Sequence, residues 1–157
     1  MNIRTIAGAI AEKFGVEGLE SRDGKIEMEI DGAPVMIEET DGDAFIFNGL
    51  VGDAPAEGGE AFARILLESN QVMMHSRAVA LARDPHSGAY VLVERVPAAA
   101  ASDFESFCAC LGKFADALES WRGTLKDFSP AAAQAAAVSV EKEAETLNAL
   151  RNGFLRI

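Results

Sequence analysis

The residues that could carry acid–base chemistry are few in this chain of 157 residues, which has two histidines. His75 precedes Ser76 in a segment that we expect to be extended, so the two side chains would point to opposite faces. His86 stands beside Asp84 in a turn-forming stretch, where a solvated histidine is more common than a general base. Neither histidine therefore predicts a catalytic pair.

The two cysteines, Cys108 and Cys110, are two positions apart in a segment with helical spacing, which points them to different faces of the helix. A disulfide between them is sterically unfavourable, and two cysteines with two histidines match no common zinc spacing. No histidine is near Cys108 in the sequence. We therefore expect two free thiols in a reducing compartment.

Acidic and glycine-rich segments could instead hold a metal or a phosphate. Residues 38–43 read Glu-Glu-Thr-Asp-Gly-Asp, but they lack the ligand order and the terminal glutamate of an EF-hand. Residues 49–52, Gly-Leu-Val-Gly, match neither a P-loop nor a dinucleotide fingerprint. The sequence thus predicts no catalytic, metal-binding or cofactor-binding residue and no cofactor. A small enzyme with a cryptic site is the least favoured function.

The charge excludes two other classes of partner. The chain has 14 Lys and Arg against 25 Asp and Glu, a net charge of −11. Nucleic acids and anionic membrane surfaces are bound by basic patches, so we expect neither as a partner. Residues 1–60 hold 4 basic and 14 acidic residues, whereas residues 61–157 hold 10 and 11. A solubilising surface explains this asymmetry most simply, and a surface for a basic partner is the alternative.

No segment approaches the run of about 20 apolar residues that a membrane-spanning helix needs. The N-terminal segment lacks the continuous apolar core of a signal peptide. We therefore expect a cytoplasmic protein without membrane insertion.

Hydrophobic spacing predicts an α+β chain with the element order α-βββ-α-ββ-α and an antiparallel sheet. Strict alternation predicts a strand over 25–31, and Asp31-Gly32 predicts a hairpin turn into a second strand over 34–38. A third strand is expected over 44–47. The first helix is predicted from apolar residues at steps of three and four and ends at Gly15; these residues are Ile3, Ile6, Ile10 and Phe14.

The second half begins with a helix that we expect to end near Asn70, followed by an extended segment over 72–81. Small or apolar residues on both sides of Val79 and Leu81 require that this strand be covered on both faces, by a helix, a second sheet or a second subunit. A strand over 90–93 stops at Pro97. A capping box of Ser102 and Glu105 predicts the start of the last main helix. Its apolar stripe is Phe104, Phe107, Leu111, Phe114, Leu118 and Trp121.

Two parts are expected along the chain. Residues 1–127 form one α+β domain, and residues 128–157 form an alanine-rich helical tail. Ser129 is a suitable N-cap and Pro130 a suitable first helical residue. The tail has few apolar residues, so we expect it to dock weakly or only against a partner.

This order of elements resembles the class I type III secretion chaperones, the Tir-chaperone (CesT-like) family. The resemblance extends from residue 1 to about residue 126 and leaves out the tail. It is carried by Leu66-Leu67-Glu68-Ser69-Asn70, by Ala80–Pro85 and Gly88–Leu92, and by the spacing of Phe107, Phe114, Trp121 and Leu125.

The resemblance implies a cytoplasmic homodimer of a Gram-negative bacterium that is not an enzyme. Such a chaperone binds the N-terminal segment of one or a few secreted effectors and keeps it soluble and partly unfolded. It presents that segment to the secretion apparatus, without ATP or another cofactor. A related α+β binding or regulatory domain without a secretion role is the alternative function.

The resemblance also implies two surfaces. The dimer interface falls on the middle helix and the strand after it, at Phe62, Ile65, Leu66, Val79 and Leu81. Effector-binding patches fall on the first helix and sheet, at Ile6, Ile10, Phe14, Met28, Ile37, Phe45 and Phe47. Both sets also fit the alternative that they form the core of a single chain.

General physical arguments suggest how a client would bind. An extended segment can add a strand to an exposed sheet edge and fill shallow apolar patches. Met28 and Met36 have flexible thioethers, which suit an adaptable binding surface. The acidic residues Glu27, Glu29 and Glu38 could steer a basic client or serve only as a solvated face.

Overall fold

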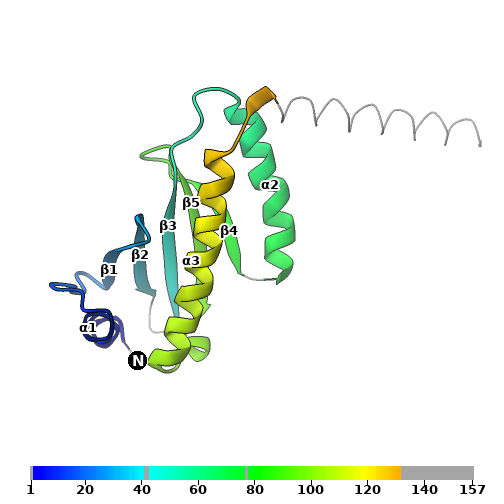
Figure 1. Ribbon diagram of the computed structural model, residues 1–157. Coiled ribbons are helices and arrows are strands. Elements are labelled where there is room, and N and C mark those ends of the chain that lie inside the picture. The colour runs from blue at the N-terminus through cyan, green and yellow to red at the C-terminus, as the bar shows by residue number, and fades with distance from the viewer. Residues whose placement is uncertain (1, 41–42, 77, 132–157) are drawn as a thin grey trace, which may run out of the picture.

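The computed structural model describes residues 2–40, 43–76 and 78–131. In these residues three α-helices pack beside a five-stranded antiparallel sheet (Figure 1), which confirms the predicted α+β class. The helices are α1 (Ile3–Phe14), α2 (Gly59–Ser76) and α3 (Phe104–Lys126), with a short 3-10 helix η1 (Ala98–Ala101). The strands are β1 (Lys25–Ile30), β2 (Ala33–Thr40), β3 (Ala44–Gly52), β4 (Val79–Arg83) and β5 (Tyr90–Pro97). Their spatial order is β1-β2-β3-β5-β4, so β1 and β4 are the two edge strands.

The first helix and the first hairpin form where their local signals predict. The Asn2 side chain accepts a hydrogen bond from the Thr5 backbone N–H at 2.9 Å, which caps the start of α1. Gly15 ends the helix in the left-handed conformation, with φ of 66°. Asp31 and Gly32 have φ of 49° and 73°, as a tight turn between antiparallel strands requires.

The helix α2 is longer than predicted. It continues to Ser76, and β4 begins only at Val79, so the expectation of an extended segment over 72–81 is wrong for its first half. His75 and Ser76 therefore belong to the last turn of α2. Asn70 does not end the helix. An asparagine favours the end of a helix when its side chain bonds to the nearby backbone, whereas the side chain of Asn70 bonds to Leu81 in β4.

The start of α3 is also different from the prediction. Asp103, not Ser102, is the N-cap, and its carboxylate accepts the Ser106 backbone N–H at 2.8 Å. Ser102 ends the preceding helix η1, so it is not part of a capping box with Glu105. An aspartate is as suitable an N-cap as a serine, and here the aspartate one position later accepts the hydrogen bond at the start of α3.

Aromatic rings of α3 pack on β3 and form the centre of the core. Phe107 meets Phe45 and Phe47 edge-on, with ring centroids 5.5 Å apart in each pair, and Phe114 meets Phe47 at 5.6 Å. Gly49 allows this approach, because a Cβ there would lie 2.6 Å from a methyl carbon of Leu118. The buried side chains of α1 and α2 join the same core cluster, so the helices cover one face of the sheet.

The predicted boundary between domain and tail lies close to a packing contact. Phe128 lies with its ring centroid 4.9 Å from that of Phe62 in α2, and Gly58 lies against Pro130. Pro130 and Ala131 are helical, as the serine–proline signal predicts. The rest of the predicted tail, 132–157, lies outside the described residues.

The Phe128 contact should contribute to the stability of the domain. We expect Phe128→Ala to lower the free energy of unfolding by about 1–2 kcal/mol, less than for a fully buried phenylalanine, because the side chain is only partly buried. Chemical denaturation measures this loss. The exposed Lys126→Ala is the control and should change the stability by less than about 0.5 kcal/mol. Equal stability of the two variants would show that residues after 127 do not belong to the domain.

The cap of α3 predicts a pH dependence. Hydrogen bonds from the backbone N–H and the hydroxyl of Ser106 hold the pKa of Asp103 below its usual 3.8. A carboxyl whose pKa is lowered by folding stabilises the fold above its unfolded pKa, and the gain is lost as the pH falls through the folded pKa. Asp103→Ala should therefore lower the Tm at pH 7, and its difference from wild type should shrink below pH 3.8. Ser102→Ala should have the smaller effect; the reverse order would restore the predicted capping box.

Candidate functional site

The face of the sheet opposite the helices has an apolar centre. Cross-strand partners show which side chains share it, because residues paired across antiparallel strands point to the same face. One row runs Glu27–Met36–Asn48–Val93–Ala80, and the next contains Leu50, Val91 and Ala82. We call these eight residues the open face. Apart from the exposed Glu27 and Ala82 they are half-buried, although no described helix lies over them.

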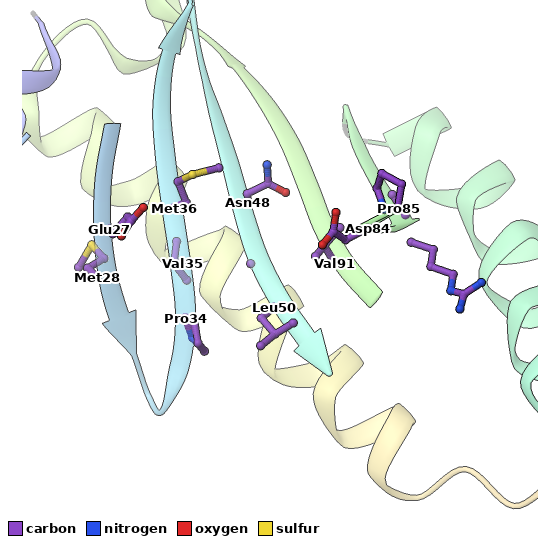
Figure 2. A pocket seen from close by; sticks show the side chains of 13 residues that line it. Glu27, Met28, Pro34, Val35, Met36, Asn48, Leu50, Asp84, Pro85 and Val91 are labelled. Carbon is purple, nitrogen blue, oxygen red and sulfur yellow. The ribbon is translucent and has the colours of Figure 1, made fainter. Parts of the chain in front are cut away.

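The open face is hollowed into a groove of about 540 Å³ (Figure 2). The side chains of Met36, Asn48, Leu50 and Val91 line its floor, and the loop at Asp84 and Pro85 borders it. The α3 helix lies behind the sheet in this view. A concave, mainly apolar surface with a single amide in its floor suits an apolar side chain of another chain.

The edge strand β1 presents open backbone groups beside this face. Glu39 N–H bonds to Gly24 C=O, so the even-numbered residues of β1 bond to β2 and the odd-numbered residues face outward. The outward groups of Lys25 are both bonded to Arg22. Within the described residues, the outward N–H and C=O of Glu27 and Glu29 have no such partner. This edge can accept another strand.

A polar hollow of about 440 Å³ lies beside the same edge. It is lined by Gly18, Leu19, Glu20, Arg22, Asp23, Lys25 and Glu27. Lys25 is partly neutralised by Glu38 on β2, at 3.6 Å between Nζ and Oε1. The surroundings of the β1 edge are therefore acidic, and a cationic client would be favoured there over an anionic one.

Most of the side chains predicted to contact an effector lie in the core. Ile6, Ile10, Ile37, Phe45 and Phe47 are at most 2% exposed, so a client on the surface cannot touch them. These five residues therefore fit the alternative that they form the core of a single chain. The sequence could not decide this, because the alternation along a strand does not reveal which face the helices cover. Phe14 is 58% exposed, and Met28 is half-buried at the β1 edge. Binding by these two remains a prediction.

The residues predicted for the dimer interface are also largely internal. Phe62, Leu66, Val79 and Leu81 are buried within the single chain, and Ile65 is half-buried. The helix α2 covers one face of β4, so a helix supplies one of the two covers that the sequence requires for this strand. The other side of β4 is part of the open face. The exposed side of α2 instead follows helical spacing through Glu60, Arg64, Leu67, Glu68, Gln71 and Val72.

The candidate chemical groups do not assemble into a reactive site. Burial raises the pKa of the Cys108 thiol, with a smaller opposing effect of Lys13, so the unreactive protonated form is favoured. The Asp84 carboxylate accepts hydrogen bonds from Ser87 and from the backbone of His86, which close a turn and lower its pKa. Among the described residues there is no metal-binding group of three or more His, Cys, Asp or Glu. No described helix has the length and hydropathy to span a bilayer.

A family model for the Tir chaperone proteins, the CesT family, matches residues 5–122. The chain belongs to this family. The predicted resemblance is thereby confirmed, and with it the general function of a type III secretion chaperone. Among curated protein sequences, none matches the chain.

Solved structures show the same fold at low sequence identity. The ExsC–ExsE complex contains a chain that is 19% identical, with a TM-score of 0.67 over 80% of this chain and 97% of that chain. The HopA1–SchA chaperone–effector complex gives 16% identity and a TM-score of 0.62 over 76% and 91%. The ExoU–SpcU complex of the type III secretion system of Pseudomonas aeruginosa gives 17% and 0.56 over 80% and 99%.

Sequence reasoning found Met36 but missed most of the open face. Leu50, Val91 and Val93 lie in strands that are apolar at consecutive positions, which is the signal of a strand with two apolar faces. The strand of Val79 has the same signal, but its outer face holds small alanines. Applied to β3 and β5, it would have predicted an uncovered apolar surface.

Proposed function

We propose that the chain binds the N-terminal segment of a secreted effector as a strand added along β1 and keeps that segment soluble and extended for export from the cytoplasm. The observation that carries this proposal is the open backbone of Glu27 and Glu29 beside an uncovered apolar groove. Two of the solved structures with this fold are complexes, and one of them is described as a chaperone–effector complex, which supports a protein client.

Strand addition makes few demands on sequence, because main-chain hydrogen bonds supply much of the attraction. Alternate client side chains then point to the two faces of the sheet. On the helical side they meet the half-buried Met28 and Ile30, which favour apolar residues. On the other side they meet Glu27 and Glu29, which favour Lys or Arg. The preferred client segment therefore alternates apolar and basic residues.

This mode of binding requires neither catalysis nor a cofactor. A bound strand is held by main-chain hydrogen bonds and apolar contacts. The pKa of Cys108, raised by burial, and the structural role of Asp84 are consistent with a protein that is not an enzyme. Conversion of a small molecule that is lost in Cys108→Ala or His86→Ala would contradict this part of the proposal.

We also propose a homodimer through the exposed side of α2. Leu67 and Val72 are 70% and 71% exposed, and Arg64 and Glu68 flank them on the same side. In a two-fold symmetric pair of helices, a contact of one residue with a second is repeated with the two copies exchanged. Arg64 of one copy can therefore approach Glu68 of the other, and Glu68 of the first can approach Arg64 of the second. The apolar residues would then be buried between the two helices.

Proline at position 27 tests strand addition directly. The Glu27 N–H faces outward, so Glu27→Pro removes a donor for the client without breaking the β1–β2 ladder. We expect client affinity, measured by calorimetry with the effector's N-terminal segment, to fall about tenfold or more. The effector is first identified by mass spectrometry of proteins that co-purify with the chain from its own host.

Glu27→Gln is the matched control, because it keeps the backbone N–H and removes only the charge. It should reduce affinity mainly at low salt, whereas the proline variant should lose affinity at all salt concentrations. Circular dichroism verifies that both variants are folded. Equal affinities of the wild type and the proline variant would reject strand addition at β1.

The burial of residues in α2 predicts which substitutions disrupt only the dimer and which unfold the chain. Leu67→Asp with Val72→Asp should give a folded monomer, because both side chains point away from the core. Leu66→Asp should instead unfold the chain, because Leu66 is 4% exposed and its charge would be buried. Light scattering and the Tm distinguish these results, with Gln71→Ala as the neutral control. A double variant that remains dimeric would place the interface elsewhere.

A further inference from the structure

The second edge of the sheet, β4, is occupied by a side chain of the same protein. The Asn70 carboxamide donates from Nδ2 to the Leu81 C=O at 2.9 Å and accepts the Leu81 N–H on Oδ1 at 2.7 Å. The amide group of Asn70 thus repeats the donor and acceptor pattern of a neighbouring strand. We call this pair of hydrogen bonds the Asn70 clasp.

Leu81 is the central outward-facing residue of β4. Arg95 N–H bonds to Ala78 C=O, and Asp84 N–H bonds to Ala89 C=O. The even-numbered residues of this strand therefore bond to β5, and its odd-numbered residues face the edge. The strand runs only from Val79 to Arg83, so three residues face outward and the clasp takes the middle one. Too few adjacent groups remain for a continuous ladder with another chain.

Asn70 lies in the interior of α2, where asparagine is a poor choice for helix stability. Its amide is half-buried, and both its nitrogen and its oxygen bond to Leu81. The same bonds hold α2 against the edge, next to Leu66, which packs in the core. The contact with β4, rather than the stability of the helix, therefore explains why an asparagine occupies position 70.

We propose that the Asn70 clasp is a built-in substitute for a sixth strand that closes the β4 edge, so that a second extended chain can pair with the sheet only along β1. The closure of β4 stands on the two hydrogen bonds, whereas its consequence for the client rests on the proposed function. A positioning residue of this kind would determine where on the sheet an effector is held and would prevent copies of the chaperone from joining edge to edge.

Hydrogen exchange followed by NMR tests the clasp without a client. In the wild type, the Leu81 amide should exchange more slowly than the outward amides of Glu27 and Glu29. Asn70→Ala should accelerate exchange at Leu81 on the order of tenfold, with little change at Ala80, whose amide bonds to β5. Asn70→Asp keeps the acceptor for the Leu81 N–H and should lie between. Gln71→Ala on the exposed side of α2 should match the wild type.

A wild-type Leu81 amide that exchanges as fast as that of Glu27 would overturn the clasp, and this result does not depend on any variant folding. Unchanged exchange at Leu81 in a folded Asn70→Ala variant would overturn it as well. Concentration-dependent association of Asn70→Ala beyond the wild-type assembly, absent in Gln71→Ala, would support closure of the edge.

A spin-labelled effector segment separates the two proposals. In the wild type it should broaden amide signals of β1 and leave those of β4 unchanged, and in Asn70→Ala it should broaden both. Broadening of β4 in the wild type would overturn the clasp and leave effector binding intact. A segment that binds without broadening either edge would instead overturn strand addition, while the exchange rate of Leu81 still decides the clasp.

Discussion

The packing of α3 on β3 is the contact on which the other features depend. Phe107 contacts the rings of Phe45 and Phe47, Phe114 contacts that of Phe47, and Gly49 lets the helix approach the sheet. Since α1 and α2 join the same core, the buried side chains of all three helices pack against one face of the sheet. The other face keeps apolar residues without a second layer, and such a surface is stable in water only if it is small or has a partner.

The local elements could be predicted from the sequence because their signals are local. The alternation of Ile26, Met28 and Ile30 and the left-handed glycine at position 15 depend on neighbours within one element. Two features could not be predicted in this way. The cap at Asp103 depended on a choice between two adjacent residues that are both suitable N-caps, and the extent of α2 past Asn70 involves a bond from Asn70 to a residue outside the helix. The insertion of β5 between β3 and β4 is likewise a long-range pairing that no periodicity encodes.

The candidate site was predicted less well than the fold for a related physical reason. A strand period gives two sets of residues but does not say which set the helices will cover. Ile37, Phe45 and Phe47, which the sequence predicts as contact residues, lie in the core, whereas Met36 and Leu50 on the same two strands line the groove. The acidity of residues 1–60 includes exposed side chains such as Glu27 and Glu29, which lie at the open edge.

The two edges of the sheet differ in a way that links binding to assembly. At β1 the backbone of Glu27 and Glu29 is open, and acidic side chains outnumber basic ones in the hollow beside it. At β4 the Asn70 amide takes the central donor and acceptor. If copies associate through the exposed side of α2, each protomer keeps its own β1 edge, because that side of the helix points away from the sheet. A dimer of this kind would hold two client strands, one along the β1 edge of each protomer.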